Sequence, residues 1–420
     1  MMSKYGILAA ALLCLSSPAM AKFEAHEWGT FTSLVGSDGR TQHGMYHEDE
    51  KLPGFVYRFG ESQKLTLSPL PDPNPNPNPT PRPCPRPSKA CFGDEVLNSN
   101  LITQKMETPV IYFYSDVRRV VQVNVKFPLG VVTEAYPLPY LTSPKDGPGL
   151  KLLNGDTTFR VNILATTVAK LQDVSETNIY SHARKVPESN IVASGQDREK
   201  FIFYRGLGQF NPRLKIQSRT GNLELYSPKG FEVPAAFLVH VGFDGKYNIK
   251  ALGNVSHARL TVSAAEIAEL SEHRTDSDEN LGEQLMLPEM LKAGLTHAEA
   301  KAMLDTWKHG YMRVPGLRLL YLLPRSEVEE ILPLVITPAP TKLERVFIGR
   351  LEILTDTEEE RILKQVLLER ENFSVASLGR FSESILRRVL QVASGRKETT
   401  KEDFEMIGQL VLRAARLETL

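Results

Sequence analysis

The sequence lacks an excess of charge of either sign. Its 420 residues include 50 Lys and Arg and 50 Asp and Glu, so the formal net charge is zero. This balance gives no general attraction to nucleic acid or to anionic lipid, and we expect no nucleic-acid partner. Hydrophobic residues make up 41% and charged residues 24% of the chain. These ordinary globular values exclude a wholly disordered chain and a collagen-like chain.

Long apolar runs are also absent. No stretch after residue 21 approaches the 18 or so apolar residues that a membrane-spanning helix needs, so we expect no membrane span. The first 21 residues read MMSKYGILAAALLCLSSPAMA, with a basic start at Lys4 and an apolar segment at Ile7–Leu15. Ala19-Met20-Ala21 has the small-x-small pattern of a cleavage site. We therefore predict that residues 1–21 are a signal peptide cleaved after Ala21, and that the mature protein is periplasmic or secreted.

Cysteine is scarce. Of three cysteines, Cys14 lies in the predicted signal peptide, so the mature chain keeps Cys84 and Cys91. The six residues between them do not match a zinc-knuckle spacing. Two cysteines in an oxidising compartment most simply pair, and we expect one Cys84–Cys91 disulfide.

Short catalytic motifs are missing as well. The sequence has no G-x-S-x-G, no S-x-x-K with its companion motifs, no P-loop and no G-x-G-x-x-G after a strand. Neither a serine nucleophile nor a phosphate-binding loop is supported. A pair of glycosidase carboxylates leaves no local pattern, so that alternative stays open.

Proline recurs at alternate positions in PLPDPNPNPNPTPRPCPRP, residues 69–87. Such a run joins neither a helix nor a sheet ladder. We predict a disordered proline-rich surface loop over residues 70–91, closed by the disulfide. A ligand for a proline-binding groove is the alternative interpretation.

The rest of the chain predicts an α+β fold with a β-sandwich-like body, a mixed segment and a C-terminal helical bundle. We expect residues 22–69 to add strands to the body and residues 92–354 to form the body itself. Val121, Val123 and Val125 alternate with polar residues, as in a half-buried strand. Asp244-Gly245 between two apolar runs is the strongest hairpin signal.

Helices are predicted where capping boxes occur. A helical hairpin is expected from Pro288–Ala293 and Thr296–His309, with Gly310 as a helix stop. Residues 355–420 are expected to pack as a helical bundle on the β body, and a partner helix or a membrane surface is the alternative for their apolar faces. The capping boxes that start these helices pair Ser263 with Glu266, Thr296 with Glu299, Thr355 with Glu358 and Thr400 with Asp403.

Five segments carry a resemblance to a known group. They are His26–Thr32 (HEWGTFT), Lys105–Tyr114, Phe203–Gly206, Gly316–Pro324 and Leu332–Pro338. With these segments the chain resembles a group of exported bacterial proteins that have a HEWGTFT segment just after the signal peptide. The resemblance implies a bacterial, exported protein that forms one integrated unit, and it implies nothing about mechanism.

Histidine and carboxylate residues gather near the start of the mature chain. His26, Glu27, His43 and His47 combine imidazole and carboxylate, which suit zinc or another divalent metal. Their spacing matches no standard zinc motif. A metal site is one hypothesis, and a polar loop with an internally hydrogen-bonded His26 is the other.

A second hypothesis places a ligand pocket in the β body. On a strand, His26 and Trp28 share one face and Glu27 points to the other. Arginines near strands clamp a carboxylate or a phosphate, or they form structural ion pairs. The candidate pocket residues are His26, Glu27, Trp28, His182, Arg184 and Arg205.

The sequence thus predicts an exported envelope protein that binds a surface partner or a glycan, or has a structural role. The alternative is a metal-assisted hydrolase that uses His26, Glu27 and a distant histidine such as His182.

Overall fold

A computed structural model of the chain describes residues 21–48, 51–59, 102–143, 154–276 and 280–417. The predicted signal peptide up to residue 20, the proline-rich loop and the expected Cys84–Cys91 disulfide lie outside these residues.

The described residues form a β-rich body followed by helices. Its strands are β1 (Phe23–Val35), β2 (Tyr57–Arg58), β3 (Gln104–Ser115), β4 (Arg119–Phe127), β5 (Gly130–Tyr136), β6 (Leu141–Ser143), β7 (Gly155–Ile163), β8 (Val192–Ser194), β9 (Asp197–Glu199), β10 (Ile202–Gly208), β11 (Lys215–Arg219), β12 (Asn222–Tyr226), β13 (Val233–Val241), β14 (Tyr247–Val255), β15 (Leu260–Val262), β16 (Gly316–Leu322), β17 (Leu334–Thr337) and β18 (Lys342–Ile353). Its helices are α2 (Ile179–Ala183), α3 (Ala264–Glu272), α4 (Leu281–Lys292), α5 (His297–Met312), α6 (Arg325–Ile331), α7 (Asp356–Glu369), α8 (Ser382–Ser394) and α9 (Lys401–Ala415), with short 3-10 turns η2 (Arg370–Asn372) and η3 (Val375–Phe381).

A nine-stranded mixed sheet is the centre of the body, in the order β14-β13-β16-β18-β1-β3-β10-β5-β2. The HEWGTFT segment lies in β1, which pairs in parallel with β18 and antiparallel with β3. β1 therefore joins residues near the start of the described chain to a strand more than 300 residues later, and contacts of such long range bind the body into one unit.

A second sheet packs on one face of the first, with strand order β17-β4-β7-β8-β9 and β6 beside β7. Val121, Val123 and Val125 of β4 alternate as the sequence predicts and are buried against Phe113 and Phe347 of the large sheet. Burying each such side chain contributes about 1.5–3 kcal/mol. The predicted α+β fold with two packed β layers is confirmed, and so is the β13–β14 hairpin around Asp244-Gly245.

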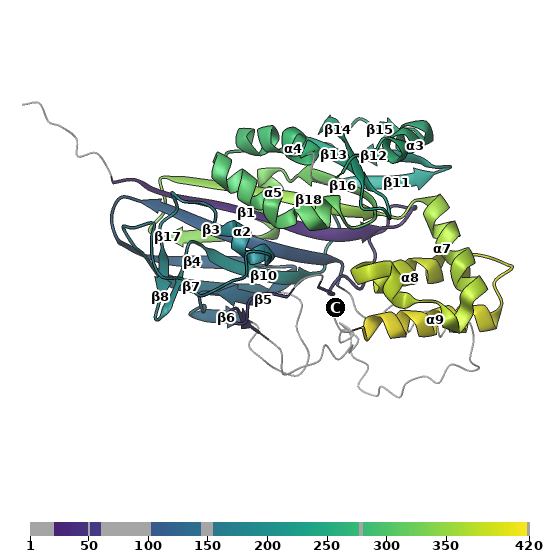
Figure 1. Cartoon of the computed structure of the whole chain (residues 1–420), viewed down its shortest axis with the longest axis horizontal. Coiled ribbons are helices and arrows are strands. Elements are labelled where there is room, and N and C mark those ends of the chain that lie inside the picture. The colour runs from purple at the N-terminus through teal and green to yellow at the C-terminus, as the bar shows by residue number, and fades with distance from the viewer. Residues whose placement is uncertain (1–20, 49–50, 60–101, 144–153, 277–279, 418–420) are drawn as a thin grey trace, which may run out of the picture.

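Helices cover the other face of the large sheet. α4 and α5 form the predicted helical hairpin and, with α2, pack on this face through a second apolar core. The helices α7, α8 and α9 gather at one end of the sheets around a third core (Figure 1). Complete capping boxes are present at Ser263, Thr296 and Thr400, and Thr355 caps α7 by accepting from the backbone N–H of Glu358.

Two helix boundaries differ from the prediction. α4 begins at Leu281 and contains Pro288, rather than beginning there. Gly310 does not end α5, which continues to Met312. α4 packs through its buried Gly282, Met286 and Met290, and Pro288 lies on its exposed side. Gly310 lies against Arg350, where tertiary packing outweighs local preference. No helix among the described residues is long and apolar enough to cross a membrane.

Candidate functional site

Buried charged side chains cross the face of the large sheet that α5 covers. Sheet register aligns them, because Thr32 of β1 pairs with both Arg350 and Lys105, while Arg318 pairs with Glu352. We call this set the charge stripe. Its members on strands are Lys105, Glu107, Glu134, Arg205, Arg318, Arg350 and Glu352, and Glu48 and Arg380 join it from outside the sheet.

Most of the charge stripe is paired internally. Glu107 accepts two hydrogen bonds from the terminal nitrogens of Arg380, at 3.0 and 3.2 Å. Glu48 lies 2.5 Å from Lys105 and 2.6 Å from Arg205. An unpaired ion inside a protein costs several kcal/mol, and such ion pairs offset this cost.

Arg350 is paired only in part. Its side chain is fully buried, and its Nε donates to Glu352 at 2.6 Å. Neither of its two terminal nitrogens has a hydrogen-bond partner among the described residues. A buried donor without a partner costs about 1–3 kcal/mol, so these nitrogens mark a position that suits an acceptor from outside the chain.

Arg350 belongs to the lining of a small cavity of about 20 Å³. The Nε atom of Arg205 and the indole nitrogen of Trp307 also have no hydrogen-bond partner within the described part of the chain. These atoms of Arg350, Arg205 and Trp307 are all hydrogen-bond donors. The lining consists of Glu48, Glu107, Ile179, Arg205, Thr306, Trp307, His309, Gly310, Arg350 and Arg380.

Gly310 keeps this cavity open on the helix side. A Cβ atom at this position would lie 2.8 Å from Nη1 of Arg350. The close approach of α5 to Arg350 explains why a glycine stands inside a helix, where it costs about 1 kcal/mol relative to alanine.

The two carboxylates of the lining are held in the ionised form. Burial alone would raise the pKa of Glu107, but Arg380 and Lys105 lower it to about 2. Burial likewise opposes ionisation of Glu48, and Arg205 and Lys105 outweigh it and lower its pKa. The cavity therefore has fixed charges of both signs, and its unpartnered atoms are hydrogen-bond donors.

The structure places His26 elsewhere. Its Nδ1 lies 3.0 Å from both carboxylate oxygens of Glu299 on α5, and Tyr114 donates to the same carboxylate at 2.6 Å. Glu27 lies on the opposite sheet face, as strand alternation predicts, where Arg345 donates to it at 2.6 Å and Tyr204 also donates to it.

Of the predicted pocket residues, Arg205 alone lines the cavity around Arg350. Trp28 is buried in the apolar core beneath the helices. His182 lies on α2 with its Nδ1 3.3 Å from Lys185, and burial together with Lys185 lowers its pKa. Arg184 forms an ion pair with Glu199 at 2.7 Å, which is the structural role that the sequence left open.

The four predicted metal ligands do not converge. His47 lies 3.7 Å from Glu383, and its backbone carbonyl accepts from Lys105, which pairs with Thr32 on β1. His26 is six residues away along that strand, about 20 Å. The described residues contain no group of three or more His, Cys, Asp or Glu side chains placed to hold a metal ion. The metal hypothesis for His26, Glu27, His43 and His47 therefore has no assembled site.

His26→Ala is expected to lower the free energy of unfolding by about 1–3 kcal/mol, because Glu299 would lose a buried partner. Burial acts to raise the pKa of Glu299, and hydrogen bonds from His26 and Tyr114 bring it below its usual value. Chemical denaturation measures the loss, and the exposed His257→Ala provides a control with a change below about 0.5 kcal/mol. Unchanged stability combined with lost metal uptake would contradict the structural role.

Sequence reasoning missed Arg350, Glu107 and Trp307. A usable signal exists for the first two, since each is a charged residue within a largely apolar stretch of strand, VFIGRLEI in β18 and KMETPVIYFY in β3. Charged residues at buried positions need partners or a ligand. Nothing in the local sequence shows that the two lie in one site.

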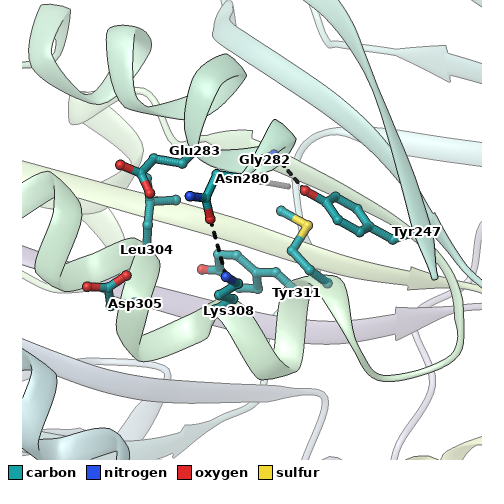
Figure 2. Close-up of a pocket in the computed structure, with 9 residues that line it drawn as sticks. Tyr247, Asn280, Gly282, Glu283, Leu304, Asp305, Lys308 and Tyr311 are labelled. Carbon is teal, nitrogen blue, oxygen red and sulfur yellow. Dashed lines mark hydrogen bonds between the residues drawn. The ribbon is translucent and has the colours of Figure 1, made fainter. Parts of the chain in front are cut away.

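A second cavity of about 30 Å³ lies between α4, α5 and β14. Figure 2 shows the backbone N–H of Gly282 donating to the hydroxyl of Tyr247 at 2.9 Å, and Lys308 donating to Asn280 at 3.3 Å. Its carboxylates, on Glu283 and Asp305, are both paired with Lys301. We assign no ligand to this cavity.

A comparison of the sequence with models of protein families gave no match, and neither did a comparison with curated proteins. Among the solved structures that match is the Fcho1 Mu homology domain of Danio rerio with a bound Eps15 peptide. It is 7% identical, and the match covers 79% of this chain and 96% of that domain with a TM-score of 0.28. At this TM-score the likeness supports no argument about fold or function, so the functional conclusions rest on the site itself.

Proposed function

We propose that the protein is an exported bacterial binding protein, and that the cavity beside Arg350 takes the anionic group of its ligand. One observation carries the proposal. Both terminal nitrogens of a fully buried arginine lack a hydrogen-bond partner among the described residues, and Arg350 lines a cavity. Export is inferred from the sequence of residues 1–21, and the ligand belongs to a surface partner or a glycan.

The guanidinium of Arg350 is fixed before a ligand arrives. Glu352 holds its Nε, and the ring of Phe381 lies 5.5 Å from its central carbon. A fixed planar fork binds an anion with two parallel hydrogen bonds and loses little conformational entropy. Such preorganisation favours affinity in a site with only a few polar contacts.

The geometry does not favour the metal-assisted hydrolase. That mechanism needs His26, Glu27 and His182 around one metal ion, but Glu27 faces the opposite side of the sheet and His182 lies beside Lys185. We therefore propose binding rather than hydrolysis.

Arg350→Met is expected to weaken anion binding at least about tenfold, since the bidentate contact disappears. Acetate, phosphate and sulfate are titrated at matched ionic strength against the fluorescence of Trp307, which lines the cavity. Arg345→Met is the matched control. It also removes a buried arginine of β18 whose Nε lies 2.6 Å from a glutamate, and it lies on the other sheet face.

A second variant protects this test against misfolding. Gly310→Ala places a methyl group against Nη1 of Arg350 while favouring the helix. It is expected to reduce anion binding in a folded protein. If the wild type binds no anion in the titration, or if Arg350→Met and Gly310→Ala both bind as the wild type does, the proposed function is wrong.

A further inference from the structure

The net charge of the cavity limits the charge of its ligand. Three guanidinium groups line it, from Arg205, Arg350 and Arg380, against two carboxylates, from Glu48 and Glu107. The lining therefore has one positive charge in excess. A single negative charge balances it, whereas a second negative charge on the ligand would meet two fixed carboxylates inside a poorly screened site.

The unpartnered atoms indicate which hydrogen-bonding atoms a ligand needs. Arg350 supplies two donors, and Arg205 and Trp307 supply one each. The carboxylates of Glu48 and Glu107 already accept hydrogen bonds from the charge stripe. A group that only accepts hydrogen bonds matches these unpartnered donors.

The volume limits the size of that group. One water-sized position needs roughly 10–15 Å³ on this measure, so a cavity of about 20 Å³ holds one or two such positions. The two oxygens of a carboxylate fit this space. A tetrahedral phosphate or sulfate has two further oxygens and needs more space than this.

We infer that the group bound beside Arg350 is a monoanionic carboxylate, in preference to phosphate or sulfate. This inference rests on the proposed function and narrows it to one ligand chemistry. The carboxylate lies in the plane of the Arg350 guanidinium and receives both terminal N–H groups. The rest of the ligand leaves the cavity past His309, the exposed residue of the lining. A uronic acid and the C-terminus of a peptide both present such a carboxylate.

The test is a competition among anions on the mature chain. Acetate, glucuronate and N-acetylglycine are titrated alongside phosphate and sulfate at matched ionic strength, with Trp307 fluorescence and calorimetry as readouts. The expected result is that at least one carboxylate binds about tenfold more tightly than phosphate and sulfate. Arg350→Met should remove this preference, and Arg345→Met should leave it in place.

Each outcome separates the two proposals. Phosphate or sulfate binding as tightly as every carboxylate, and depending on Arg350, would overturn the carboxylate inference and leave the proposed function standing. Absence of any binding that depends on Arg350 would overturn both. Tighter binding of glucuronate than of N-acetylglycine would support the inference and indicate a glycan source, and the reverse order would support it and indicate a peptide source.

Discussion

Replacing Glu352 by glutamine is expected to lower the free energy of unfolding by about 3–5 kcal/mol. Glu352 lies between two fully buried arginines, 3.0 Å from Nε of Arg318 and 2.6 Å from Nε of Arg350. Removing its charge leaves two buried cations without their shared counter-ion. Arg318 also donates to the carbonyls of Gly310 and Tyr311 at the end of α5, so the damage extends to that helix.

Urea denaturation of the wild type and of Glu352→Gln measures this loss. Glu344→Gln is the control on the same strand, because Glu344 makes only partly exposed ion pairs, with Arg325 and Lys342. Exposed pairs contribute about 0–1 kcal/mol, so the control should change little. Equal effects of the two variants would show that the charge stripe does not stabilise the fold.

Acidification is expected to remove about 3 kcal/mol of stability through Glu107 alone. Its pKa is about 2 in the folded protein against an ordinary value of 4.5, because Arg380 and Lys105 overcome the effect of burial. A depressed carboxyl pKa stabilises the fold fully above the unfolded value, and this contribution is lost as pH falls from 4.5 toward 2. Each pKa unit corresponds to about 1.4 kcal/mol.

The difference in unfolding free energy between the wild type and Glu107→Gln isolates this contribution. It should be constant near neutral pH and shrink as pH falls below about 4.5, because the protonated wild type then resembles the variant. Other carboxylates contribute equally to both proteins and cancel. A difference that stays constant down to pH of about 2 would contradict the assigned ion pair between Glu107 and Arg380.

Local patterns in the sequence were sufficient for much of the fold. Alternation predicted β4, and Asp244-Gly245 predicted the β13–β14 hairpin, because both signals depend on neighbouring residues. Gly310 was misread for a physical reason. A glycine near the end of a helix normally marks its stop, but here the absent side chain makes room for Arg350, which is 40 residues away in the sequence.

The site was less accessible to sequence reasoning. Arg205 was singled out as a residue able to clamp an anion, and it lines the cavity. Glu107 and Arg350 come together only because β1 pairs with both β3 and β18. Spacing along the chain does not encode that register. The histidines at residues 26–47 looked more promising because they are close in sequence, yet β1 separates His26 from His47.

The most direct test of the central claim is a crystal structure of residues 22–420. Crystals are grown once with acetate and once with selenate, whose selenium is located by anomalous scattering, and Gly310→Ala is treated in the same way. The account predicts an anion with oxygens about 3 Å from both terminal nitrogens of Arg350 in at least one wild-type crystal, and none in Gly310→Ala. Water alone beside Arg350 in both wild-type crystals would contradict it.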